Sequence, residues 1–164
     1  MMRYGLIGLS LILLLSCSSR PRSVPKEYVP TINKAIKHAT PVGKKVLNTA
    51  HSMSYANPKV VRGSCWDYIN AIYIRSGYGY KKQTIFKGGK SGPYAPIYSI
   101  ESGDWLYHIN HEYRGAEHSG IFIGWIDLEH RKALMLSYRG MGSSEPARYQ
   151  VYTLSHVYNI KRGF

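Results

Sequence analysis

Two side chains in this 164-residue chain have types and positions that could do chemistry together. Cys65 begins a segment with helical apolar spacing, and His118 begins a strand-like apolar segment further along. A thiolate is a strong nucleophile, and a histidine within hydrogen-bond reach can take the thiol proton and later return it to a leaving group. The pair therefore predicts nucleophilic catalysis, with Cys65 as nucleophile and His118 as general base.

The residues around Cys65 predict that it lies in the first turn of a helix. Ser64 is a favourable N-cap residue, and Asp67 three positions later would complete a capping box. Gly77 then offers the left-handed residue that commonly ends a helix. A helix N-terminus stabilises a nearby anion, so this position favours the thiolate. Its backbone N–H groups could also stabilise an oxyanion.

The rest of the body predicts helices first and strands afterwards. Helical spacing covers residues 31–40, and Thr40-Pro41 resembles the start of a second helix that runs to about Met53. The stretch from Tyr78 to Ser99 is rich in Gly, Pro and Lys and predicts a long loop. Strand-like runs follow at residues 104–109, 121–126, 133–138, 149–152 and 158–161. This order predicts an α+β domain with an antiparallel sheet.

The N-terminus predicts export. Arg3 precedes an apolar run that ends before Ser16-Cys17, a pattern typical of a secretory signal and too short for a bilayer-spanning helix of about 20 residues. Leu14-Leu15-Ser16-Cys17 resembles a bacterial lipobox, in which the cysteine is lipidated and becomes the mature N-terminus.

These features divide the chain into three parts. We expect a signal peptide at residues 1–16, lipidated Cys17 and a flexible tether at residues 17–30, and a single domain at residues 31–164. The expected location is the bacterial cell envelope, on the periplasmic side of the outer membrane in a Gram-negative cell. With Cys17 as the anchor, Cys65 is a lone thiol in an exported protein, which indicates a reactive group. The alternative is a buried structural cysteine.

The net charge of +13 favours acidic partners such as anionic lipid surfaces or anionic wall polymers. Export argues against nucleic acid, and no nucleic-acid-binding motif stands out. A solvated surface charge without a specific partner is the alternative.

Three motifs occur in the order and spacing of the NlpC-type (NlpC/p-sixty) cysteine peptidases. They are Gly63-Ser64-Cys65-Trp66, the run from Ile100 to Tyr107, and His118-Ser119-Gly120-Ile121-Phe122-Ile123-Gly124. The resemblance covers residues 63 to about 138. It implies a papain-like fold and, without a cofactor or metal, hydrolysis of an amide bond in peptidoglycan stem peptides. Cys65 would be the nucleophile and His118 the base, with peptidoglycan or its peptide fragments as the partner.

The chain departs from the family pattern around both catalytic positions. Ser64 and Trp66 flank the cysteine where the family usually has Asp and Ser. The polar residue that orients the histidine should fall near Met135 or Leu136, and Ser137 is the nearest polar candidate. Trp66 and Tyr138 are candidate substrate-contacting residues.

Three alternatives remain open. A metal site could use His108, His111, Glu112 and His118, although these residues show no established zinc spacing and could be solvated loop histidines. A wall-binding or scaffold lipoprotein of the same fold could use the 15 tyrosines and 3 tryptophans to stack on sugars. The same dyad could also hydrolyse amide or acyl bonds of lipids.

Overall fold

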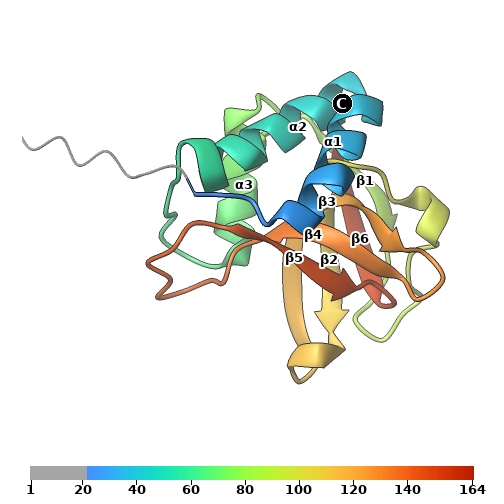
Figure 1. Cartoon of the computed structure of the whole chain (residues 1–164). Helices are drawn as coiled ribbons and strands as arrows, with labels where there is room; N and C mark the ends of the chain where they lie inside the picture. The colour runs from blue at the N-terminus through green and yellow to red at the C-terminus, as the bar shows by residue number, and fades with distance from the viewer. Residues whose placement is uncertain (1–21) are drawn as a thin grey trace, which may run out of the picture.

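The structure, a computed structural model, describes residues 22–164; the predicted signal peptide and Cys17 lie outside them. Helices pack against one antiparallel sheet (Figure 1), which confirms the predicted α+β class. Among the described residues, no helix combines the length and apolarity needed to cross a bilayer.

The helices are α1 (Val29–His38), α2 (Pro41–His51) and α3 (Cys65–Arg75). The strands are β1 (Lys82–Lys87), β2 (Trp105–Asn110), β3 (Ala116–Asp127), β4 (Lys132–Ser137), β5 (Arg148–Thr153) and β6 (Val157–Gly163). They form a six-stranded sheet in the order β1-β6-β2-β3-β4-β5. Short 3-10 turns occupy Lys26–Tyr28, Ile97–Ser99 and His111–Tyr113, and a π-helical turn occupies Ser52–Ala56.

Two boundaries differ from the sequence predictions. The segment from Tyr78 to Ser99 is not all loop, because β1 lies within it and pairs with β6 at the sheet edge. The predicted tether also ends too late, since the chain is helical from Lys26 and the Arg22 backbone N–H donates to the Tyr55 carbonyl at 3.1 Å. Proline and glycine residues indicated irregular structure in both places. Strand pairing of β1 with β6 and packing of the N-terminal segment on the domain override that local signal.

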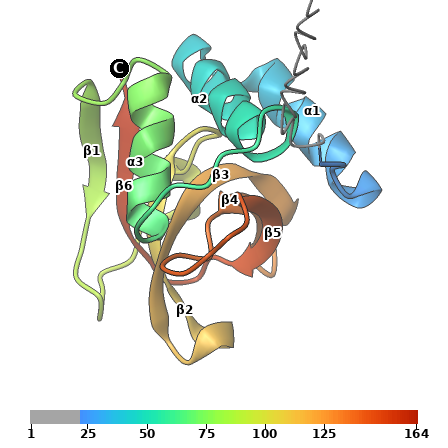
Figure 2. The same cartoon turned by 90° about the vertical axis from the view of Figure 1, so that its left-hand side faces the viewer.

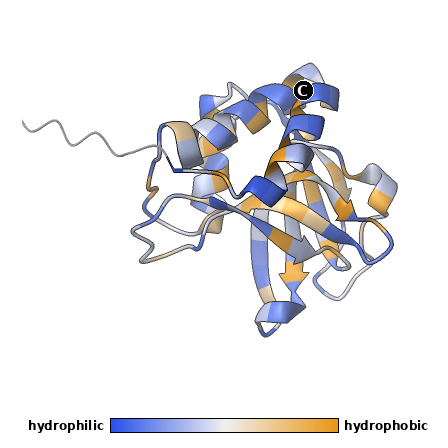
Figure 3. Cartoon of the chain, viewed as in Figure 1, coloured by the Kyte–Doolittle hydropathy of each residue, from blue (hydrophilic) through white to orange (hydrophobic). Residues whose placement is uncertain are grey.

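Alternate residues of the central strands build two cores on the two faces of the sheet, as the period of two in a strand requires. Trp105, Ile121 and Leu136 face the helices. Leu106 and Phe122 belong to a second cluster on the opposite face. Hydrophobic colours accordingly run along the central strands in Figure 3. Every side chain on β3 is therefore committed to one face or the other.

Helix α3 is fixed at its N-terminus and along its buried side. The Asp67 carboxylate accepts the Ser64 backbone N–H at 2.7 Å and the Ser64 hydroxyl at 2.8 Å, which confirms the predicted capping box. Tyr68 and Tyr73 are fully buried. The Tyr73 hydroxyl donates to the Gly103 carbonyl at 2.9 Å. These contacts hold Cys65 at a defined place above β3.

The Gly103-Asp104 motif is structural. Gly103 has φ +98°, and a Cβ there would lie 2.6 Å from the Gly43 Cα on α2. The buried Asp104 carboxylate accepts two hydrogen bonds from the Arg162 guanidinium, at 2.7 and 2.8 Å. A bidentate pair of this kind gives a defined geometry. It ties the start of β2 to the end of β6.

Candidate functional site

Cys65 is the first residue of α3 and is partly exposed. The Ser119 hydroxyl donates to its sulfur, with 3.6 Å between Oγ and Sγ. Ser119 is 3% exposed, so the thiol lies directly against β3. The structure thus places Cys65 beside the residue that follows His118.

The backbone around Cys65 offers an N–H group for a developing negative charge. No residue among 22–164 accepts a hydrogen bond from the backbone N–H of Cys65 or of Trp66. Gly140, in the loop between β4 and β5, has φ +102°, and a Cβ there would lie 3.9 Å from the Cys65 nitrogen. Glycine suits this position because of its positive φ, and it brings the β4–β5 loop next to the Cys65 nitrogen.

His118 is held by Tyr152. Its Nε2 lies 3.3 Å from the Tyr152 hydroxyl, and its ring packs edge-on against His108 with centroids 5.7 Å apart. Because Ser119 points to Cys65, the alternation of a strand directs His118 to the opposite face of the sheet. In the part of the chain that the structure describes, no hydrogen bond joins Cys65 to His118. Cys65 contacts the residue that follows His118 on β3, but it forms no hydrogen bond with His118 itself among the described residues.

The edge of β3 is open where His118 lies. The pairing of β3 with β4 ends at Gly120 and Ser137, so the first residues of β3 pair only with β2. Figure 2 shows the β2–β3 hairpin extending past the other strands. A Cβ on Gly120 would lie 2.7 Å from the Leu136 carbonyl oxygen, so this glycine permits the close approach of β4. The Cys65 thiol and the His118 imidazole therefore lie on opposite faces of β3, next to the point where its pairing with β4 ends.

Burial and hydrogen bonding determine the states of Tyr152 and His118 in this cluster. Burial raises the pKa of Tyr152, and the hydrogen bond with Ser137 lowers it by a smaller amount. Among residues 22–164, the Nδ1 of His118 has no hydrogen-bond partner, and it is not among the enclosed atoms, whereas both ring nitrogens of His108 are enclosed.

Burial keeps both histidines of this cluster neutral. It lowers the pKa of His118 to about 4. The pKa of His108 falls to about 3, first because of burial and then because of the neighbouring His118. A neutral imidazole is the form that can accept a proton, and a pKa this far below neutrality also makes it a weaker base than a free histidine.

The polar partner of His118 is Tyr152, with Ser137 behind it. The Ser137 and Tyr152 hydroxyls lie 2.8 Å apart, and no hydrogen bond is described between Ser137 and His118 themselves. Ser137 therefore belongs to the cluster but can affect His118 only through Tyr152. Alternation on β5 predicted a strand there, yet no pattern in the sequence indicated that Tyr152 faces the histidine.

The two candidate substrate-contacting residues have different environments. Trp66 is 46% exposed beside Cys65, and its ring lies 5.6 Å from that of Trp105. Tyr138 is 1% exposed, stacks on Tyr68 at 4.5 Å and donates to the Val61 carbonyl at 2.8 Å. Trp66 can contact a substrate, whereas Tyr138 supports the core beneath α3.

The residues of the alternative metal site are spread out. His111 and Glu112 lie exposed on the turn after β2, and His111 packs against His156 with ring centroids 4.2 Å apart. Glu112 accepts a hydrogen bond from Thr153 at 2.8 Å. Within residues 22–164, no group of three His, Cys, Asp or Glu side chains could hold a metal ion.

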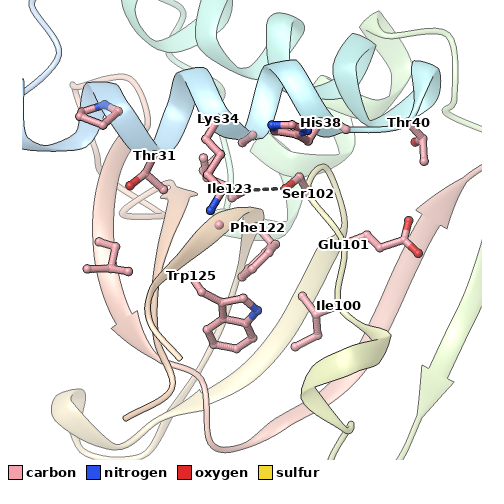
Figure 4. Close-up of a pocket in the computed structure, with 15 residues that line it drawn as sticks. Thr31, Lys34, His38, Thr40, Ile100, Glu101, Ser102, Phe122, Ile123 and Trp125 are labelled. Carbon is pink, nitrogen blue, oxygen red and sulfur yellow. Dashed lines mark hydrogen bonds between the residues drawn. The ribbon is translucent and has the colours of Figure 1, made fainter. Parts of the chain in front are cut away.

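Two cavities lie near the sheet, and Cys65 lines neither of them. One of about 380 Å³ is bounded by Ser137 and the β4–β5 loop, including Arg139 and Arg148. The other, of about 780 Å³, lies between α1 and the second half of β3, with Lys34 above Trp125 (Figure 4). The smaller cavity adjoins the Tyr152–His118 cluster through Ser137, whereas the larger one is distant from it along β3.

Comparison with known proteins gives no match, whether to a family model, to a curated protein or to a solved structure. What defines the chain is therefore its own geometry, an α+β domain with a thiol at a capped helix start on one face of β3 and a partly buried histidine on the other face.

Proposed function

We propose that this protein is a cysteine hydrolase with a papain-like NlpC-type fold that cleaves an amide bond in peptidoglycan stem peptides. One observation carries the proposal. The Cys65 thiol sits at the capped start of α3 and is hydrogen-bonded by Ser119, the immediate neighbour of a neutral histidine held by Tyr152. The motifs around Cys65 and His118 support the substrate class.

The reaction uses groups that this site provides. The Cys65 thiol gives its proton to Nδ1 of His118, and the thiolate attacks the carbonyl carbon of the amide. The carbonyl electrons move to the oxygen, which the Cys65 backbone N–H stabilises. The intermediate collapses, the C–N bond breaks, and His118 protonates the leaving amine. Water then attacks the thioester carbonyl and gives one proton to His118. The C–S bond breaks, the carboxylic acid product leaves, and His118 returns the proton to the Cys65 thiolate.

The proton transfer requires His118 and Cys65 to come within hydrogen-bond reach. Catalytic hydrogen bonds are commonly long or poorly aligned in a free enzyme and tighten when substrate binds. The backbone pairing of β4 with β3 ends at Gly120, so no hydrogen bond from β4 fixes the backbone at His118. The side chain that must move is His118, whose ring is hydrogen-bonded by Tyr152 and packs edge-on against His108.

The proposed location is the cell envelope, with the lipid on Cys17 as anchor. The lipobox-like Leu14-Leu15-Ser16-Cys17 supports it, and the net charge of +13 suits a surface rich in anionic polymers. The substrate polymer would then lie within reach of the anchored domain.

The test is cleavage of soluble peptidoglycan fragments by the purified full-length chain, followed by mass spectrometry. The same assay is run with Cys65→Ala and with Cys65→Ser, which preserves the size and polarity of the side chain. We expect cleavage by the wild-type chain alone, with all three proteins giving the same circular dichroism spectrum. Cleavage that survives Cys65→Ala would exclude Cys65 as the nucleophile.

Two further outcomes separate the alternatives. Cosedimentation with insoluble peptidoglycan, without cleavage of any fragment, would favour a wall-binding or scaffold protein. Release of fatty acid from lipid amides or esters, lost in Cys65→Ala, would favour a lipid hydrolase with the same nucleophile.

A further inference from the structure

We propose that Tyr152 and Ser137 together set the tautomer of His118, with the hydrogen on Nε2 and the lone pair on Nδ1. The catalytic meaning of this proposal rests on the proposed function, because Nδ1 is then the atom that takes the thiol proton. The tautomer itself is a property of the resting protein and can be measured without any substrate.

The two distances at the Tyr152 hydroxyl differ in a way that places its hydrogen. Its distance to the Ser137 hydroxyl is 2.8 Å, and its distance to Nε2 of His118 is 3.3 Å. O–H donors usually sit about 2.5–3.0 Å from their acceptors, and N–H donors extend to about 3.2 Å. The single phenol hydrogen therefore points to Ser137. The phenol oxygen is left as an acceptor for the N–H at Nε2.

Ser137 can accept the phenol hydrogen because its own hydroxyl hydrogen can be donated elsewhere. Ser137 is one of the residues that line the cavity of about 380 Å³ at the β4–β5 loop, which is large enough to hold water. The serine hydroxyl can donate to water there while its oxygen accepts from Tyr152. The chain of donors then runs in one direction, from His118 through Tyr152 and Ser137 to solvent.

The surroundings of the cluster offer no competing partner. Among the described residues, both ring nitrogens of His108 lack hydrogen bonds, so this neighbour takes neither the phenol hydrogen nor the Nε2 hydrogen. Met135, where an orienting polar side chain is expected, is fully buried among apolar residues of the second core. Tyr152 reaches His118 from β5, one strand further away, because its side chain is long enough to span β4.

This arrangement gives Ser137 a testable effect on a residue that it does not touch. In Ser137→Ala, the phenol loses its Ser137 acceptor and its hydrogen turns to its other partner among the described residues, Nε2 of His118. The imidazole must then carry its hydrogen on Nδ1, where it cannot accept the thiol proton. In Tyr152→Phe, neither tautomer is favoured by a partner.

The experiment is nitrogen-15 NMR of the histidine rings in the full-length chain at pH 7, with the His118 signals assigned through His118→Gln. We expect an Nε2–H tautomer in the wild-type chain and a shift towards Nδ1–H in Ser137→Ala. Ser137→Thr, which keeps a hydroxyl, should restore the wild-type pattern. The matched control is Tyr149→Phe, another buried β5 tyrosine, whose hydroxyl contacts His51 instead.

Cys65 alkylation by iodoacetamide and cleavage of peptidoglycan fragments supply the functional readout. We expect Ser137→Ala to lower the alkylation rate and kcat by roughly threefold to tenfold, the effect of one net hydrogen bond, with KM unchanged. An Nδ1–H tautomer in the wild-type chain would overturn the proposal, and so would an unchanged tautomer in Ser137→Ala. The wild-type spectrum decides even if a variant does not fold. An Nε2–H wild-type tautomer in a chain that cleaves nothing would leave this inference standing and remove the proposed function.

Discussion

Strand β5 carries two tyrosines that each hold a histidine, on opposite faces of the sheet. On the helix face, the Tyr149 hydroxyl lies 3.0 Å from Nδ1 of His51, at the end of α2. On the other face, the Tyr152 hydroxyl lies 3.3 Å from Nε2 of His118. The two pairs involve the same chemical groups at similar distances.

Their surroundings differ in what lies behind the tyrosine and beside the histidine. Tyr149 stacks on Tyr55 with ring centroids 5.0 Å apart, and among the described residues its hydroxyl contacts only His51. Tyr152 has the Ser137 hydroxyl behind its phenol, and its histidine precedes the serine that donates to Cys65. A tyrosine–histidine bond alone thus indicates packing. It indicates a catalytic role when a proton acceptor lies behind the tyrosine and a nucleophile lies near the histidine.

The largest expected difference between the pairs is in activity. His118→Ala removes the general base and should lower kcat/KM for peptidoglycan fragments by about 10²- to 10⁴-fold. His51→Ala removes an imidazole whose partners are Tyr55 and Tyr149 on the helix face, and kcat/KM should change by less than about twofold. Initial rates measured for both variants beside the wild-type chain check this. Equal losses of kcat/KM in the two variants would show that the Tyr152–His118 pair has no catalytic role that the Tyr149–His51 pair lacks.

The sequence predicted the parts of this site that depend on local signals. The Ser64–Asp67 capping box, the helix that Cys65 begins and the strand that carries His118 follow from patterns within a few residues of one another. The partner of the histidine did not follow. Tyr152 reaches it across β4, and which tyrosine of β5 faces the histidine depends on strand register. Register is a property of the folded sheet and not of any short segment.

A second expected difference is in the dependence of stability on pH. Burial holds the pKa of His118 at about 4 in the folded protein, against about 6.5 when unfolded. Between these values the unfolded chain binds more protons, so the free energy of unfolding falls as the pH drops from 6.5 towards 4. The shift corresponds to at most about 3 kcal/mol. Urea unfolding across this range should show a shallower decline for His118→Gln than for the wild-type chain.

The lowered pKa of His118 also determines the lowest pH at which the protein should stay active. A base that is neutral down to a pH of about 4 should keep its function well below pH 6.5. A rate of Cys65 alkylation that follows a histidine pKa near 6.5 would contradict the burial of His118.

His108, which packs against His118 and Tyr152, allows a test of the cost of burying unpaired polar atoms next to this pair. Among residues 22–164, both of its ring nitrogens are buried without hydrogen bonds, which usually costs about 1–3 kcal/mol. His108→Phe removes these nitrogens while keeping a ring against His118 and Tyr152. We expect the free energy of unfolding at pH 7 to rise by about 1 kcal/mol, because the slightly larger ring offsets part of the gain. His38→Phe, on the exposed side of α1, is the control and should change stability by less.

The smallest effect separates what the two hydroxyls do. Tyr149→Phe and Tyr152→Phe each remove one hydrogen bond to a histidine from a buried ring, so each should lower the free energy of unfolding by about 1 kcal/mol. Only Tyr152→Phe should also slow the alkylation of Cys65. Urea unfolding and alkylation are measured on the same samples. A loss of thiol reactivity in both variants would mean that it follows general stability. A loss confined to Tyr152→Phe would assign it to the bond between Tyr152 and His118.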